Sequence, residues 1–244
     1  MSSSKYVPQL RAIASPERST SIKARESWHI LGIISEFVEA AEKLSEIRPA
    51  VSIFGSARIK PGHEWYETTV QLARKLSDAG FAVLSGGGPG IMEAANKGAF
   101  EGKAPSVGLN IQLPHESTGN AYQNISVYFR HFFPRKVAFA KYATAFVGMP
   151  GGFGTLDELA EVLTLIQTGM GRRIPVILYG SAFWHGLLGW MRESMLGNGL
   201  IGATDLELMQ VVDEPDDVVN AIFDFYQNRG FAPTPTERES ILHL

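Results

Sequence analysis

Two glycine-rich segments are the places in this chain where residue types and spacing suit the binding of an anion. They read SGGGPGIMEA at 85–94 and MPGGFGTLDE at 149–158, and each leads from a short apolar run into a helical pattern. Glycines let the backbone approach a ligand closely, while the first N–H groups of a helix and its dipole attract negative charge. A phosphate group is therefore the expected ligand, and FGSAR at 54–58 forms a third loop of the same kind.

Two well-known phosphate-binding fingerprints fit these loops poorly. Neither glycine-rich segment ends in the Gly-Lys-Ser/Thr of a nucleoside-triphosphate loop, so no lysine is offered to a γ-phosphate. Gly86, Gly88 and Gly90 alternate, but the third glycine of a GxGxxG dinucleotide fingerprint would fall at Ile91, and no acidic residue ends a following strand. Nucleoside triphosphates and NAD therefore rank low, and we expect no cofactor.

Thr155 and Glu158 are three residues apart, so they share one face of a helix predicted to start near Gly152. A carboxylate beside a phosphate cradle is electrostatically unfavourable unless it takes part in chemistry. The same two residues also match a capping box, in which their side chains satisfy the N–H groups at the helix start. Capping leaves Gly151, Gly152 and Gly154 unexplained, so a functional role is the preferred interpretation.

Arg135 is a second candidate. It lies in FFPRKVAF near the start of a helix predicted over 134–143, where the helix dipole repels a cation and a purely structural arginine gains little. Its planar donor fork suits a phosphate, and a solvated surface arginine is the alternative. The six histidines show neither HExxH nor paired helical spacing, and the chain has no cysteine. We therefore expect no metal site.

The overall composition narrows the function further. The 244 residues include 22 Lys and Arg against 25 Asp and Glu, and 45% are apolar, which is enough to form a core and excludes dominant disorder. Because no basic stripe stands out, no nucleic acid polymer is expected as a partner. No apolar run is long enough to cross a membrane, and no secretory signal is visible, so the expected location is cytoplasmic.

Strand and helix patterns alternate along the chain without a linker. Predicted strands lie within 50–58, 81–84, 106–113, 124–129, 144–149, 173–180 and 209–212. Predicted helices lie at 28–47, from about Val70 to Gly80, from Pro89 to 100, and at 134–143, 151–169, 183–195 and 215–226. Such alternation calls for one doubly wound parallel sheet with helices on both faces, an α/β fold.

Domain limits follow from the ends of this pattern. Residues 1–25 carry five basic residues, one acidic residue and several serines, which favours a flexible or partner-docking extension over an organelle transit peptide. One domain is predicted over 26–229, followed by a polar C-terminal tail over 230–244.

With these features together, GSAR, SGGGPGIMEAANKGA, the helix bearing PRK, and PGGFGTLDE resemble the Lonely Guy (LOG) family across roughly residues 48–225. These proteins are cytokinin riboside 5′-monophosphate phosphoribohydrolases, long called lysine decarboxylases. The decarboxylase label finds no support here, because nothing identifies a Schiff-base lysine with its pyridinium partner. The predicted helix at 28–47 and the tail after 226 resemble a longer subgroup of the family.

The resemblance implies a Rossmann-like single domain that hydrolyses the N-glycosidic bond of AMP or an N6-modified AMP to free base and ribose 5-phosphate. It implies a homodimer or larger homo-oligomer with the active site at a subunit interface. Arg135 and Glu158 carry over as catalytic residues. The candidate substrate-binding residues are Gly55, Ser56, Gly87, Gly88, Gly90, Met92, Lys136, Gly151, Gly152, Gly154 and Thr155. A non-catalytic molybdenum-cofactor carrier of the same fold is the alternative, and the Arg135 and Glu158 pair distinguishes the two because pure binding does not require it.

Overall fold

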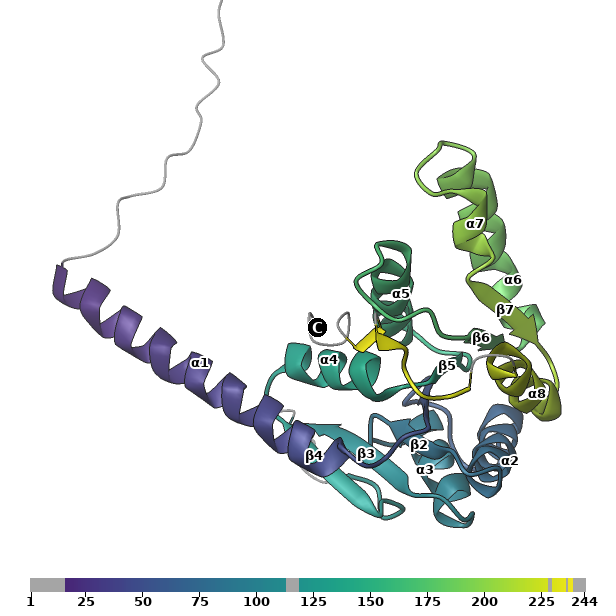
Figure 1. Ribbon diagram of the computed structural model, residues 1–244, viewed down its shortest axis with the longest axis horizontal. Coiled ribbons are helices and arrows are strands. Elements are labelled where there is room, and N and C mark those ends of the chain that lie inside the picture. Colours follow the sequence, from purple (N-terminus) through teal and green to yellow (C-terminus); the bar gives the residue numbers. More distant parts are fainter. Residues whose placement is uncertain (1–15, 113–118, 228–229, 236, 239–244) are drawn as a thin grey trace, which may run out of the picture.

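The structure is a computed structural model that describes residues 16–112, 119–227, 230–235 and 237–238 (Figure 1). In the first half of the chain the elements are α1 (Pro16–Leu44), β1 (Ala50–Phe54), α2 (Glu64–Asp78), β2 (Ala82–Ser85), α3 (Ile91–Phe100), β3 (Ser106–Ile111) and β4 (Ile125–Phe129). They are followed by α4 (Phe132–Tyr142), β5 (Ala145–Gly148), α5 (Phe153–Gln167), β6 (Val176–Tyr179), α6 (Ser181–Trp190), η1 (Met191–Leu196), α7 (Ala203–Leu206), β7 (Met209–Val212) and α8 (Pro215–Tyr226).

Within the described residues, seven strands form one sheet in the order β4-β3-β2-β1-β5-β6-β7, and every neighbouring pair is parallel. The chain runs outward from β1 to β4, returns to β5 beside β1, and then runs outward in the other direction. The predicted doubly wound parallel sheet is confirmed. The order reverses between β1 and β5, and ligands of such sheets bind in the crevice outside the carboxyl ends of the strands at that point.

Two layers of helices cover the sheet, because its central strands are buried on both faces. On one face α1, α4, α5 and α6 bury a cluster that includes Leu44, Phe139 and Trp184. On the other face α2, α3 and α8 bury a cluster that includes Leu72 and Ile222. The two apolar clusters together fix the ends of the strands, and therefore the loops that follow them.

The N-terminal helix is longer than predicted. It starts at Pro16 rather than Trp28, so residues 16–25 are helical and the predicted flexible extension is corrected there; residues 1–15 lie outside the described part. Proline at the first helical position, followed by Glu17, favours a helix start. Figure 1 shows α1 extending well away from the sheet. The predicted domain start at residue 26 therefore falls inside a continuous helix.

The C-terminal boundary also differs. The predicted tail begins at residue 230, yet Phe231 packs against Phe81 and Tyr226, with ring centroids 5.3 and 4.6 Å apart, so the described start of the tail belongs to the core. The predicted strand 209–212 and helix 215–226 are confirmed. Helix α4 starts two residues earlier than predicted, η1 extends α6 as a short π-helical turn, and α7 was not predicted. No helix in the described ranges is long and apolar enough to span a membrane.

Candidate active site

A cavity of about 1250 Å³ opens at the carboxyl ends of the strands around the point where the strand order reverses. It receives side chains and backbone from the loops after β1, β2 and β5 and from helices α4 and α5. Eleven of the thirteen predicted site residues line it: Gly55, Ser56, Gly87, Gly88, Met92, Arg135, Gly151, Gly152, Gly154, Thr155 and Glu158. The parallel sheet thus brings together residues as far apart in sequence as Gly55 and Glu158.

Direct backbone contacts join the three loops. The Ser56 N–H donates to the Pro150 carbonyl at 3.1 Å, and the Ile91 N–H donates to the Ser56 carbonyl at 3.0 Å. Gly90 does not line the cavity; its φ of +71° and the closeness of the Ser56 carbonyl leave no room for a side chain. Gly90 therefore has a packing role, which lets the β1 and β2 loops lie against each other, and its ligand role stays a prediction.

Helix α5 starts at the predicted place but without the capping box. Its N-cap is Gly152, no side chain hydrogen-bonds to the cap, and Thr155 lies inside the first turn. The capping interpretation of Thr155 and Glu158 is therefore wrong. The N-terminus of α5 faces the cavity with its positive dipole end, and this end of a helix favours an anionic ligand.

The glycines of this loop differ in what requires them. A side chain on Gly151 would overlap the Thr155 hydroxyl, so the fold itself requires that glycine. A Cβ on Gly152 or Gly154 would meet nothing within 4 Å. Between them Phe153 is 92% exposed. The open space over Gly152 and Gly154 is available to a ligand, and packing within the protein does not account for either residue.

Glu158 lies one turn into α5, with only 8% of its surface exposed. Burial raises the pKa of its carboxyl to about 7, and this effect outweighs the opposing attraction of the positive charges of Arg135 and Lys136. Among the described residues no hydrogen bond or ion pair engages the carboxyl oxygens. Near neutral pH the group therefore exists in both protonation states, which is the condition for acid, base or electrostatic catalysis.

Arg135 is not the solvated surface arginine that was the alternative. Its side chain lies against the Phe139 ring, with the guanidinium carbon 5.5 Å from the ring centroid, and one terminal nitrogen donates to the Gly86 carbonyl at 3.3 Å. Its Nε is buried without a hydrogen-bond partner in the described residues. Burial lowers the pKa of the guanidinium, and Glu158 opposes that shift. Arg135 thus brings a largely desolvated positive charge with unused donors to the cavity wall.

Lys136 does not line the cavity. Its ammonium pairs with Asp157 at 2.7 Å and with Glu161 at 3.1 Å, so it links α4 to α5. These ion pairs give the lysine a structural role, because they hold the helix of Arg135 beside the helix of Glu158; its substrate-binding role stays a prediction. Its positive charge acts on the site at a distance, by opposing the rise that burial causes in the pKa of Glu158.

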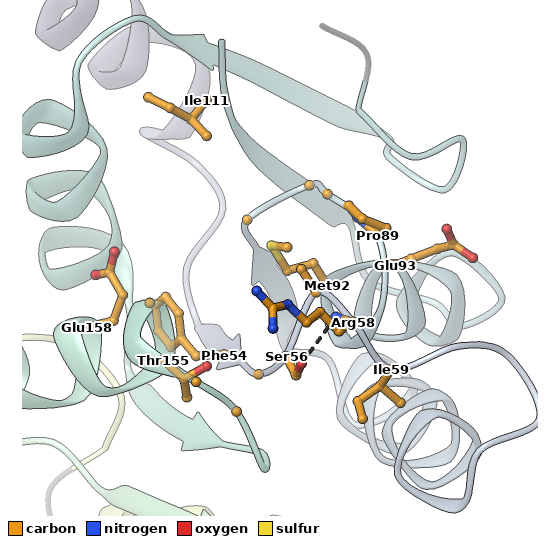
Figure 2. A pocket seen from close by; sticks show the side chains of 18 of the residues that line it. Phe54, Ser56, Arg58, Ile59, Pro89, Met92, Glu93, Ile111, Thr155 and Glu158 are labelled. Carbon is orange, nitrogen blue, oxygen red and sulfur yellow. Dashed lines mark hydrogen bonds between the residues drawn. The ribbon is translucent and has the colours of Figure 1, made fainter. Parts of the chain in front are cut away.

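Arg58 is a cavity residue that the sequence reasoning missed. It is exposed, and its N–H donates to the Ser56 hydroxyl at 3.1 Å. Figure 2 shows its side chain extending from the β1 loop toward the middle of the cavity, with Glu158 on the opposite wall. Its position in GSAR, three residues after Gly55, was the available signal. Tyr128 and Phe132 also line the cavity; Phe132 opens the FFPRKVAF segment that was singled out only for its arginine.

The loop after β2 is braced by amide side chains. The Gly87 carbonyl accepts from the Asn120 N–H at 2.7 Å and from the Gln123 amide at 3.1 Å, and the Gly88 carbonyl accepts from the Asn120 amide at 3.1 Å. Asn96 connects this brace to the core, since its side chain bonds to Asn120 and to Ser85. The carbonyls of Gly87 and Gly88 are thus bonded to the segment before β4, while the Gly86 carbonyl accepts from Arg135.

A doubly wound α/β sheet with a glycine-lined cavity at its switch point is the arrangement of nucleotide-binding and phosphate-binding proteins. Within that class, the chain belongs to the LOG family, because the family model described as "Possible lysine decarboxylase" matches residues 92–222, more than half of its length. The predicted family is therefore confirmed. No three His, Asp or Glu side chains gather as metal ligands in the part of the chain that the structure describes.

Named relatives and solved structures agree with this placement. Cytokinin riboside 5′-monophosphate phosphoribohydrolase LOG of Oryza sativa subsp. japonica is 28% identical over 208 residues, covering 79% of this chain and 84% of its own. LOG1 of Arabidopsis thaliana is 25% identical, covering 65% and 75%. The molybdenum cofactor carrier protein of Chlamydomonas reinhardtii shares the fold with a TM-score of 0.56 at 20% identity, covering 74% of this chain and 99% of its own.

Proposed function

We propose that this protein hydrolyses the N-glycosidic bond of purine nucleoside 5′-monophosphates, AMP or an N6-modified AMP, to free base and ribose 5-phosphate. One observation carries the proposal. The buried, unpaired carboxyl of Glu158 shares a cavity with the buried guanidinium of Arg135 and the open N-terminus of α5. The names of the LOG relatives support the same reaction class.

The phosphate end of the substrate is assigned to the N-terminus of α5. First-turn N–H groups, the helix dipole and the free space over Gly152 and Gly154 form a cradle of the right charge and size. Arg58 adds a mobile positive charge from the facing loop, and no ion pair holds it within the described residues. The 5′-phosphate held there fixes the ribose next to Glu158, one turn along the same helix.

The chemistry follows from this placement. Breaking the bond between ribose C1′ and the base builds positive charge on the sugar ring. Ionised Glu158 stabilises that charge or orients the water that attacks C1′, and Arg135 holds the substrate in place. The aromatic side chains of Tyr128 and Phe132 offer flat apolar surface to the departing base. In the low-dielectric cavity a carboxylate has a larger effect than it would in water.

The family resemblance also leads us to propose a homo-oligomer in which a second subunit completes the active site. Phe132 and Phe153 at the cavity wall are 56% and 92% exposed, and apolar rings left in water at the edge of a cavity support this arrangement. Among the described residues, neither phenylalanine belongs to the two apolar clusters of the core or stacks with another aromatic ring.

The test is a substrate panel. Purified protein is incubated with AMP, isopentenyl-AMP, GMP and CMP, and released base is separated by chromatography. Base and ribose 5-phosphate in equal amounts from AMP or its N6-modified form support the proposal, and the ratio of turnover among the four gives the base preference. Saturable nucleotide binding without release of any base would instead make the protein a carrier, and binding of none would place the function elsewhere.

A further inference from the structure

The outer half of α1 carries apolar side chains that no part of the described domain covers. Trp28 is 75% exposed, and Leu31, Ile34 and Val38 are each at least half exposed. In Figure 1 this helix runs out from the sheet, and only its C-terminal part lies against β4 and α4. Leaving several large apolar side chains of one helix in water is unfavourable, so their shared position needs an explanation.

The exposed residues form a stripe on the face of α1 opposite its domain contacts. Glu36, Ala40 and Leu44 are buried at intervals of four and mark the face that meets the domain. Leu31, Ile34 and Val38 recur at intervals of three and four on the other face, which is the spacing of a helix-pairing seam. The small residues Ala24, Ser27 and Ala41 continue the stripe at both ends and allow close approach of a second helix.

Charge is divided between the two halves of the helix. Exposed Lys23 and Arg25 outnumber Glu26 in the N-terminal half. Glu39 and Glu42 outnumber Lys43 in the last two turns, and exposed Glu46 lies just beyond the end of the helix. A parallel pair of such helices would place like charges side by side. An antiparallel pair places the basic half against the acidic half and also opposes the two helix dipoles.

We propose that α1 pairs with α1 of a second copy of this chain, antiparallel, with the apolar stripes in contact and the two helices crossing near Ile34 and Ser35. The free half of each helix is then covered by the half of the other that is anchored to its own domain. The proposal does not depend on the reaction at the cavity. A membrane surface fits less well, because the acidic half of the stripe would be repelled by anionic lipid.

The first test compares matched substitutions. Leu31→Glu places a charge in the stripe, and Leu200→Glu makes the same change at a residue that is 71% exposed in the loop after η1. Both are surface changes, and circular dichroism verifies folding. By sedimentation velocity of the full chain, Leu31→Glu should halve the mass of the assembly and Leu200→Glu should leave it unchanged. Equal masses for the wild type and Leu31→Glu would overturn the proposal.

Charge reversal tests the direction of the pair. Lys23→Glu with Arg25→Glu should weaken association at low salt at least tenfold, and so should Glu42→Lys with Glu46→Lys. An equimolar mixture of the two double variants should restore association, because a helix that is acidic at both ends then meets one that is basic at both ends. The quadruple variant should also associate, because in an antiparallel pair each reversed half again meets its opposite, whereas a parallel pair would keep like charges together. If the quadruple variant associates no better than either double variant, the antiparallel arrangement is wrong.

Cross-linking provides an independent geometric test, because the chain has no cysteine of its own. With a short bismaleimide, Ser35→Cys should cross-link to itself across the symmetry axis. Ser27→Cys and Ala41→Cys should cross-link only when the two variants are mixed. Cross-linking of Ser27→Cys to itself would indicate a parallel pair, and absence of product at all three positions would exclude pairing through this face. Binding of the monomeric protein to anionic vesicles, with no self-association, would also overturn the proposal.

Discussion

The loops after β2 and β5 look alike in sequence, since both are rich in glycine and both lead into a helix, yet the structure uses them differently. The β2 loop has its carbonyls bonded to Asn120 and Gln123, and Gly87 adopts a φ of +72° beside Asn110. The β5 loop leaves open space over Gly152 and Gly154 and exposes a helix N-terminus to the cavity. The β2 loop is thus held by hydrogen bonds within the protein, whereas the β5 loop keeps free space in front of a helix N-terminus.

The contrast teaches that a glycine is informative only together with its surroundings. At Gly87 the backbone conformation and a nearby amide exclude any other residue, so the requirement comes from the fold. At Gly154 nothing in the protein excludes a side chain, so the requirement, if the proposed function holds, comes from the ligand. Glycine is therefore required by the fold in one loop and, under the proposed function, by the ligand in the other.

The largest effect on activity is expected from a substitution of Glu158. Glu158→Gln keeps the shape of the side chain and removes its charge, so kcat for AMP hydrolysis should fall by about 100-fold or more while the protein stays folded. Steady-state kinetics with base release as the readout measure this. Glu207→Gln, at an exposed position directly after α7 and outside the cavity lining, is the matched control and should retain activity. Unchanged turnover in Glu158→Gln would remove the residue from the mechanism.

A substitution in the β2 loop should lower the stability of the protein. Gly87→Ala forces a side chain into a left-handed backbone conformation and against the Asn110 amide, so the free energy of unfolding should drop by about 1–3 kcal/mol. Urea denaturation followed by circular dichroism gives the value. A variant as stable as the wild type would show that the brace yields readily and that the two loops are less different than their contacts indicate.

The pH dependence sharpens the role of the cradle. The raised pKa of Glu158, about 7, predicts that kcat/KM rises as pH increases through 7 and then levels off, because the ionised carboxylate is the active form. Below the midpoint the fall should approach tenfold per pH unit. The AMP phosphate titrates near pH 6, about one unit lower, so the two groups are separable. Activity that instead declines above pH 7 would make Glu158 a general acid.

The smallest effect is expected within the cradle glycines. Gly154→Ala meets no neighbour and improves helix propensity by up to about 1 kcal/mol, so stability should be equal or slightly higher. The added methyl group takes ligand space, so KM for AMP should rise several-fold with kcat less affected. Gly186→Ala in α6 is the matched control, because a Cβ there also meets nothing within 4 Å. A rise in KM for both variants would argue against a specific cradle.

The sequence predicted the parts of the molecule that depend on local pattern. Strand and helix alternation was sufficient for the doubly wound sheet. The position of Arg135 near a helix start and the glycine-rich loop before Glu158 marked both residues, and the family resemblance joined them in one site. The sequence did not predict the choice of partners among polar side chains. Lys136 pairs with two carboxylates on a helix that is distant in sequence, and such pairing depends on how α4 and α5 pack.

Other differences have equally local causes. Gly90 was grouped with the ligand glycines because its neighbours are, but its contact with the Ser56 carbonyl exists only once two loops meet. Arg58 was missed although it belongs to GSAR, because an exposed arginine in a loop is common and only the fold directs it into the cavity. The early start of α1 was missed because residues 21–32 are exposed, and no buried face imposes an apolar period on that part of the helix.

Because Glu158 is partly protonated near pH 7, nucleotide binding should be coupled to proton uptake. A phosphate dianion and a nucleoside that exclude water both favour the neutral carboxyl, so association just above pH 7 should take up protons from the buffer. The heat measured on titrating AMP into the protein then varies with the ionisation enthalpy of the buffer. The pH midpoint of kcat should also lie above that of kcat/KM, because the carboxyl of Glu158 binds its proton more tightly when the ligand is bound.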